Sequence, residues 1–126
     1  GEGGVVSIFC RLLAQGKGVT VFGDGEQTRD FVYAGDIAEA LLRSVRLPGY
    51  NIINVSTRQE TSLNQLLAAF RKAVGHDFAV DYGPARKGDI LRSVLDNTRC
   101  RQLLEFCPSM DLERGVSLTY ADYLRQ

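Results

Sequence analysis

One helix is marked at both of its ends by the sequence, and it limits what the chain can fold into. Its apolar residues recur at helical spacing from Leu63 to Val74, which places them on one face. Ser62 and Gln65 form a capping-box pair at its start, and Gly75 supplies the left-handed residue that often ends a helix. A helix with one apolar face has to bury that face against a second layer. The sequence therefore predicts a packed globular fold.

Further helices alternate with short stretches that favour extended structure. Apolar spacing and helix-start residues predict four more helices, over residues 5–15, 36–47, 96–104 and 111–124, with Asp36, Asp96 and Asp111 as candidate N-caps. Glu39 stands in capping-box position after Asp36. β-branched, aromatic or alternating residues predict strands over residues 19–22, 29–33, 50–55 and 78–82. The chain is thus expected to be a mixed α/β protein with short strands and about five helices.

Composition excludes several classes of protein. The 126 residues carry 15 basic and 15 acidic side chains, so no net charge attracts nucleic acid or an anionic membrane. No apolar run approaches the roughly 20 residues of a membrane span. Three cysteines, Cys10, Cys100 and Cys107, lack metal-ligand spacing and indicate reduced thiols in a cytoplasmic protein, with no metal site. The chain starts without methionine, so we expect an excerpt of a longer protein, although an expression scar gives the same start.

Two arginine-bearing loops are the candidates for chemistry. The first is GDGEQTRDFVY, which contains Arg29, and the second is GPARKGDI, which contains Arg86 and Asp89. A guanidinium is a planar fork of donors that matches phosphate oxygens, so two such groups can clamp one pyrophosphate. Asp89 can accept hydrogen bonds from sugar hydroxyls, and Phe22 can offer an aromatic face to a base. The alternative is that these charges form weak pairs on solvated turns.

The order of these segments resembles a known family. The run VTVFGDGEQTRDFVYAGDIAEALL, residues 19–42, is similar to the signature of extended short-chain dehydrogenase/reductases that act on nucleotide sugars, such as UDP-glucose 4-epimerases. YNIINVST, TSLNQLL, ARKGDI and DLERGVSLTYADYL follow in family order. The resemblance implies that residues 1–126 are the C-terminal, substrate-binding lobe of such an enzyme. Helix 36–47 and strand 50–55 would then complete the edge of a Rossmann sheet.

The resemblance also implies roles for six residues. Arg29 matches the arginine that grips the nucleotide diphosphate, Arg86 a second arginine on the phosphate and ribose side, and Asp89 an aspartate that binds ribose hydroxyls. The strand residues Thr20, Val21 and Phe22 match the segment that receives the base. The expected ligand is a UDP-sugar, with a dTDP-sugar next. The alternative is that these residues serve only to pack the framework.

The family's catalytic half has no counterpart in this sequence. No G-x-x-G-x-x-G turn is present for NAD, and none of the five tyrosines has a lysine four residues later to make it a base near pH 7. We therefore expect an NAD-dependent epimerase or dehydratase as the parent enzyme. This chain alone should contain no catalytic residue, bind no NAD and turn over no substrate. The rival reading is a non-catalytic, stand-alone binding or interaction module.

The sequence departs from the family pattern at two places. Ser56 and Arg58 stand where glycines usually follow the strand, and Glu105 stands where a glycine precedes an aromatic residue and a proline. Glycine permits close backbone approach, so ligand contact at residues 56–58 is in question. Without a Rossmann sheet, strand 50–55 lacks its usual neighbours. We therefore expect a homodimer or an oligomer paired through that edge.

Overall fold

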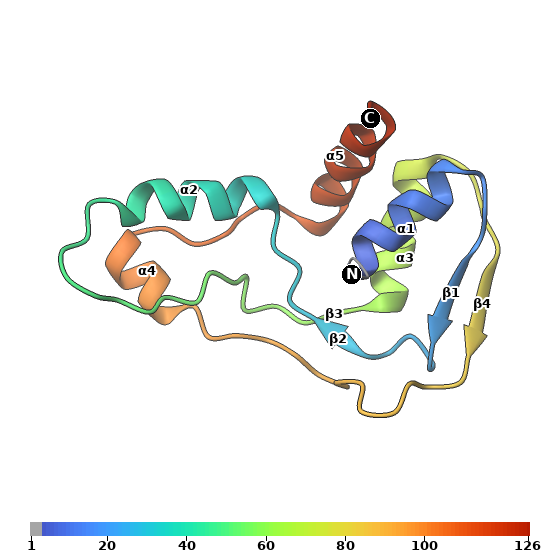
Figure 1. Ribbon diagram of the computed structural model, residues 1–126, viewed down its shortest axis with the longest axis horizontal. Helices are drawn as coiled ribbons and strands as arrows, with labels where there is room; N and C mark the ends of the chain where they lie inside the picture. The colour runs from blue at the N-terminus through green and yellow to red at the C-terminus, as the bar shows by residue number, and fades with distance from the viewer. Residues whose placement is uncertain (1–3) are drawn as a thin grey trace.

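The computed structural model describes residues 4–126, and it arranges them around two separate apolar clusters. The helices are α1 (Val5–Ala14), α2 (Ala34–Ser44), α3 (Leu63–Val74), α4 (Thr98–Leu104) and α5 (Leu112–Leu124). The strands are β1 (Val19–Phe22), β2 (Thr28–Arg29), β3 (Thr61–Ser62) and β4 (Val80–Gly83). Figure 1 shows α1, α3, α5, β1 and β4 at one end, with α2 and α4 at the other. The predicted mixed α/β fold with five helices is confirmed.

No helix among the described residues has the length and apolar character needed to cross a membrane.

The larger cluster forms around α3, as its sequence pattern predicts. Leu66, Leu67 and Phe70 are almost fully buried on the face of α3 that meets α1, α5 and β1. The Phe70 ring meets the Phe9 ring of α1 edge to face, with the centroids 5.9 Å apart. Side chains of this size contribute about 1.5–3 kcal/mol each when fully buried. This cluster therefore holds the lobe together.

Both ends of α3 match the prediction. The Ser62 hydroxyl accepts a hydrogen bond from the Gln65 amide, and the Gln65 side chain accepts one from the Ser62 amide. Gly75 ends the helix with a φ of 85°, in the left-handed region that glycine enters without steric cost. The capping box and the glycine stop therefore fix where this helix begins and ends.

Two short sheets position the loops that follow. β1 and β4 pair in parallel, with Val19 opposite Val80 and Phe22 opposite Gly83. The strands approach closely at Gly18, where a β-carbon would lie 2.6 Å from the carbonyl oxygen of Ala79. β2 and β3 pair antiparallel through residues 28–29 and 61–62. The predicted strand 19–22 is confirmed, whereas the strand predicted over 78–82 begins two residues later because its partner sets the register.

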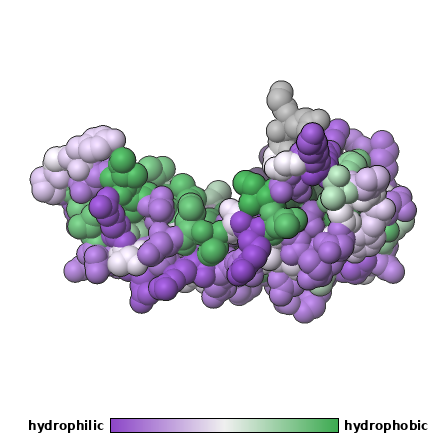
Figure 2. All heavy atoms as spheres, turned by 90° about the horizontal axis from the view of Figure 1, so that it is seen from below, coloured by the Kyte–Doolittle hydropathy of each residue, from purple (hydrophilic) through white to green (hydrophobic). Residues whose placement is uncertain are grey.

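The second cluster is small and lies between α2 and α4. Ala40, Cys100 and Leu104 are buried there. Arg43 of α2 donates to the carbonyl oxygens of Leu104 and Glu105, at 3.2 and 3.1 Å, and its guanidinium lies over the Phe106 ring. Arg43 thereby satisfies carbonyls at the end of α4 that have no partner within the helix. Exposed apolar side chains remain on this end of the molecule (Figure 2), among them Leu41, Leu42, Val45, Tyr50 and Ile52.

Several predictions about local structure are wrong. Helix α2 begins at Ala34, and Asp36 does not cap it, because its Oδ2 accepts hydrogen bonds from the distant amides of Ser109 and Met110. The capping-box role of Glu39 therefore also fails. α4 has Asn97, not Asp96, at its N-cap. In place of the strand predicted over 29–33, the strand β2 covers only Thr28–Arg29, so residues 30–33 are not in a strand.

The segment over residues 50–55 is not a strand, contrary to the sequence prediction. Tyr50 and Ile52 are mostly exposed, and no other strand in residues 4–126 pairs with this segment. A strand requires a hydrogen-bonded partner, and this segment has none here. That the edge pairs with a second copy remains a prediction.

Candidate functional site

A cavity of about 340 Å³ lies where the end of β1 meets helix α1. One wall is mostly apolar and comes from α1 and α3, through Val5, Ile8, Phe9, Leu12 and Leu63. The other wall comes from β1 and the two arginine-bearing loops, through Thr20, Val21, Phe22, Gln27, Arg29, Arg86 and Asp89. The structure thus brings all six residues singled out by the sequence to one cavity. A larger cavity of about 590 Å³ between α2 and α4 contains none of them.

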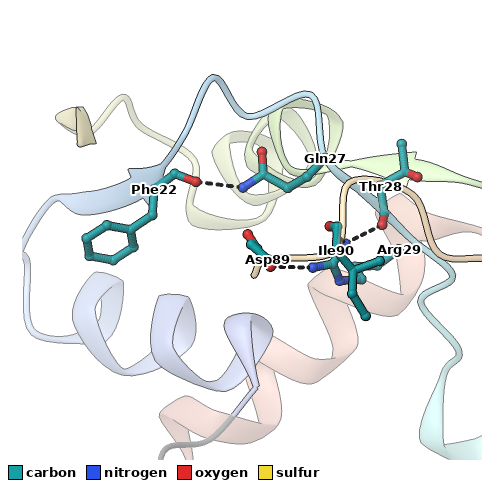
Figure 3. Close-up of polar contacts among 6 residues, drawn as sticks. All are labelled: Phe22, Gln27, Thr28, Arg29, Asp89 and Ile90. Carbon is teal, nitrogen blue, oxygen red and sulfur yellow. Dashed lines mark hydrogen bonds and ion pairs between the residues drawn. The ribbon is translucent and has the colours of Figure 1, made fainter. Parts of the chain in front are cut away.

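Arg29 ties the two loops together, as Figure 3 shows. Its Nη1 donates to the carbonyl oxygens of Thr28 and Ile90, at 2.7 and 2.6 Å. Its Nη2 donates to Oδ1 of Asp89 at 2.9 Å, across 60 residues of sequence. Both charged side chains remain about 30% exposed, at 29% and 32%. The pair therefore sits at the rim of the cavity, where solvent still reaches it.

Arg86 reaches the same cavity from the second loop and lies over the ring of Phe22. Its guanidinium carbon is 4.0 Å from the ring centroid, within the range of a cation–π contact. Phe22 ends β1 and is 37% exposed, since its side chain points to the open side of the strand. The cavity thus has two guanidinium groups on its polar wall, one paired with Asp89 and one stacked on an aromatic ring.

Gln27 is a site residue that the sequence prediction missed. Its side chain is buried, and Nε2 donates to the carbonyl oxygen of Phe22 at 2.9 Å (Figure 3). This bond closes the loop between β1 and β2 and fixes the end of β1. The sequence shows only a polar residue beside Thr28 and Arg29, in the loop between two predicted strands, and such a residue looks like any solvated loop residue.

The glycine turn before Gln27 is held from α3. The backbone N–H of Asn64 donates to the carbonyl oxygen of Gly25 at 3.0 Å. The side-chain Nδ2 of Asn64 donates to the carbonyl oxygen of Asp24 at 3.1 Å. The Tyr82 hydroxyl donates to Asn64 Oδ1 at 2.8 Å. The GDG turn is therefore an anchored element of the site. It connects the cavity wall to the best-defined helix of the fold.

Asp30 lies next to the site but serves a different segment. Its carboxylate accepts hydrogen bonds from the Thr57 amide and hydroxyl and from the Arg58 amide. Arg58 has a φ of 61°, a left-handed conformation that is unusual for a residue with a side chain. Glu105 has a φ of 50°. Both residues stand where the family resemblance implies glycine, and both keep a conformation that glycine would adopt more easily.

Hydrogen bonding or burial shifts the pKa values of three side chains, Glu60, Cys10 and Cys100. Two hydrogen bonds from Arg92, with one from the Thr28 hydroxyl, lower the pKa of Glu60 from 4.5 to about 2. Burial raises the pKa of Cys10 and of Cys100, which disfavours the reactive thiolate. Among residues 4–126, no group of three or more potential ligands gathers to hold a metal ion.

Comparison with known proteins identifies relatives of this chain. A family model described as the NAD dependent epimerase/dehydratase family matches residues 1–56. A UDP-glucose 4-epimerase of Mycolicibacterium smegmatis is 41% identical over 120 residues, which is 94% of this chain and 38% of that protein. The chain therefore spans well under half the length of its relatives.

Solved structures agree with this relationship. A UDP-glucose 4-epimerase of Thermotoga maritima, solved with UDP-glucose, matches with a TM-score of 0.90 and 38% identity, over 99% of this chain and 40% of that one. A UDP-glucose 4-epimerase of Thermus thermophilus, solved with NAD, matches with a TM-score of 0.86 and 33% identity, over 99% of this chain and 41% of that one. Residues 1–56 therefore match the NAD dependent epimerase/dehydratase family, and nearly the whole chain is similar to a part of the UDP-glucose 4-epimerases, so that it resembles a fragment of an extended short-chain dehydrogenase/reductase.

Proposed function

We propose that residues 1–126 form the nucleotide-sugar-binding portion of an NAD-dependent epimerase or dehydratase, with a UDP-sugar as the preferred ligand and a dTDP-sugar next. The observation that carries the proposal is the convergence of Arg29, Arg86 and Asp89 on one cavity of about 340 Å³. Cavities that hold small ligands range from about 300 to 1,000 Å³. A relative with 38% identity over nearly all of this chain was solved with UDP-glucose.

Arg29 has donors left for a diphosphate. A guanidinium offers five N–H donors. Three are used, on the carbonyls of Thr28 and Ile90 and on Asp89, and among the described residues Arg29 makes no further hydrogen bond. The remaining Nε and Nη2 hydrogens can each donate to a phosphate oxygen. Charge-assisted bonds of this kind contribute about 1.5–3 kcal/mol each.

Asp89 suits the sugar side of the ligand better than the phosphate side. A carboxylate only accepts hydrogen bonds, and ribose hydroxyls can donate to it, whereas a phosphate at neutral pH cannot. Its pairing with Arg29 holds it at the rim beside the proposed phosphate position. Residues 20–22 would receive the base along β1, since all three line the cavity.

NAD does not fit the residues described here. A dinucleotide site needs a glycine-rich turn between a strand and a helix, so that the pyrophosphate can reach the helix N-terminus. The β3–α3 junction has that order, but its backbone amides already donate to other groups: those of Ser62 and Gln65 to each other's side chains, and the two between them to carbonyl oxygens of the loop before β2. Relatives solved with NAD are more than twice as long as this chain. We therefore assign NAD to the part of the relatives that this chain does not span.

The test is calorimetric titration of the chain with UDP, dTDP, GDP and NAD. UDP or dTDP should bind weakly, and Arg29→Ala should abolish that binding. Arg92→Ala is the matched control, because this exposed arginine also pairs with a carboxylate but lies outside the cavity. Circular dichroism verifies that both variants fold. Tight binding of NAD, or an equal loss of UDP binding in both variants, would refute the proposal.

The rival function is a non-catalytic, stand-alone binding or interaction module. The chain given UDP-glucose and NAD should show no conversion under either reading. An upstream reading frame that encodes a glycine-rich turn and a Tyr-x-x-x-Lys pair would decide for the enzyme. A start codon directly before Gly1 would decide for the module.

A further inference from the structure

We infer that Phe22 acts on the ligand through Arg86: its ring is the support that holds the Arg86 guanidinium over the cavity. This inference rests on the proposed function, because it assigns a positioning residue to the same site. It also replaces the sequence-based expectation that Phe22 itself offers its face to the base.

The first observation is the stacking distance. The guanidinium carbon of Arg86 lies 4.0 Å from the centroid of the Phe22 ring, so the planar group covers a ring face. A base that stacked on that face would have to displace the guanidinium. The structure therefore places a cation, and not an open aromatic surface, at this point of the wall.

The second observation is that the ring itself is held. Phe22 pairs with Gly83 across the parallel strands, and the Gly23 amide donates to the Gly83 carbonyl at 2.9 Å. A β-carbon at Gly83 would contact Cδ1 and Cε1 of Phe22 at 3.5 and 3.7 Å, so the glycine lies against one edge of the ring. Gln27, which directly precedes β2, donates a hydrogen bond from its side chain to the Phe22 carbonyl oxygen. The ring is thus a preset platform at the mouth of the cavity.

The third observation is the character of the loop that carries Arg86. Lys87 and Asp89 flank Gly88, which has a φ of 82° and nothing within 4 Å of its added β-carbon. Arg29 anchors the far end of this loop through Asp89 and Ile90. A long side chain on such a loop loses rotamer entropy when a ligand fixes it, which weakens binding. Because stacking on Phe22 already orders the Arg86 side chain in the free protein, less of this entropy is lost when the ligand binds.

The experiment is a double-mutant cycle on UDP binding, measured by calorimetry with Phe22→Leu, Arg86→Ala and the double variant. Phe22→Leu should weaken UDP binding about fivefold, the size of a half-exposed cation–π contact. In the Arg86→Ala background, Phe22→Leu should have no further effect, because the group it supports is gone. Phe22→Tyr keeps an aromatic face and should retain the wild-type affinity. Phe22→Met keeps the apolar bulk without a ring and should resemble Phe22→Leu, which covers the case in which the leucine variant folds poorly.

The outcomes distinguish a failure of the role inferred for Phe22 from a failure of the proposed nucleotide-sugar binding. Equal weakening by Phe22→Leu with and without Arg86 would overturn the inference and show that the ring contacts the ligand directly. Retained affinity in both Phe22→Leu and Phe22→Met would overturn it as well. If the wild-type chain binds neither UDP nor dTDP, the proposed function fails first, and this inference fails with it. If it binds dTDP alone, the same cycle is measured with dTDP.

Discussion

Gly25 is the position where the support of the site can be tested most sharply. It has a φ of +80°, and its carbonyl accepts a hydrogen bond from the Asn64 amide. A β-carbon at Gly25 would lie 2.2 Å from Oδ1 of Asn64 and 2.7 Å from its Nδ2. Gly25→Ala therefore forces a left-handed conformation on a residue with a side chain, and it also expels the Asn64 side chain.

The two costs can be estimated separately. The left-handed conformation costs about 1–2 kcal/mol for a residue with a β-carbon. Expelling Asn64 breaks its hydrogen bonds to the Asp24 carbonyl, to Glu26 and to the Tyr82 hydroxyl. These groups are exposed and can turn to water, so their loss costs about 0.5 kcal/mol each, at the low end for hydrogen bonds. The expected total is about 3 kcal/mol. Gly16→Ala is the matched control, because Gly16 also has a positive φ, of +72°, but has open space around it.

Urea unfolding followed by circular dichroism measures both variants. Gly25→Ala should lower the free energy of unfolding by about 3 kcal/mol, and Gly16→Ala by about 1–2 kcal/mol. In an Asn64→Ala background the steric conflict is absent, so Gly25→Ala should then cost no more than Gly16→Ala. Equal costs of the two glycine substitutions in the wild-type background would refute the reasoning, since they would show that Asn64 moves aside freely.

Three further predictions concern the framework. Arg58→Gly and Glu105→Gly should each raise the free energy of unfolding by about 0.5–1 kcal/mol, because both residues have a left-handed φ, and a lower melting temperature would contradict this. The pKa of Glu60 is held at about 2 by Arg92, below the ordinary 4.5, so this pair stabilises the fold above about pH 4.5 and its contribution fades as the pH falls toward 2. The stability lost in Glu60→Gln at neutral pH should therefore disappear near pH 2 in a series of thermal melts. Arg43→Ala removes the partner of the last carbonyls of α4, so hydrogen exchange should accelerate in α4 and stay unchanged in α3.

Local signals were reliable where the structure also depends on local contacts. Helix α3 has its cap, apolar face and stop within fourteen residues, from Ser62 to Gly75, and all three are observed as predicted. Asp36 looked like an equally good cap, yet its carboxylate accepts hydrogen bonds from Ser109 and Met110, more than 70 residues away. A carboxylate binds whichever amides the fold brings near it, and a sequence shows only its neighbours.

The failed strand over residues 50–55 has the same cause. The sequence shows an apolar, β-branched run that suits a buried strand, but a strand exists only where a second backbone completes its hydrogen bonds. No partner strand occurs among the described residues. The pattern therefore records a preference that this part of the protein does not satisfy by itself.

The sequence alone determined the mixed α/β class, the ends of α3, the strand over residues 19–22 and, through its motifs, the resemblance to the epimerase family. It also selected the six residues of the candidate site, but it could not show that they meet. Only the tertiary structure placed Arg29 beside Asp89 and Arg86 over Phe22. Side chains 60 residues apart become neighbours only when the packing of α1 and α3 and the pairing of β1 with β4 bring their loops together, and those contacts are distributed over the whole lobe.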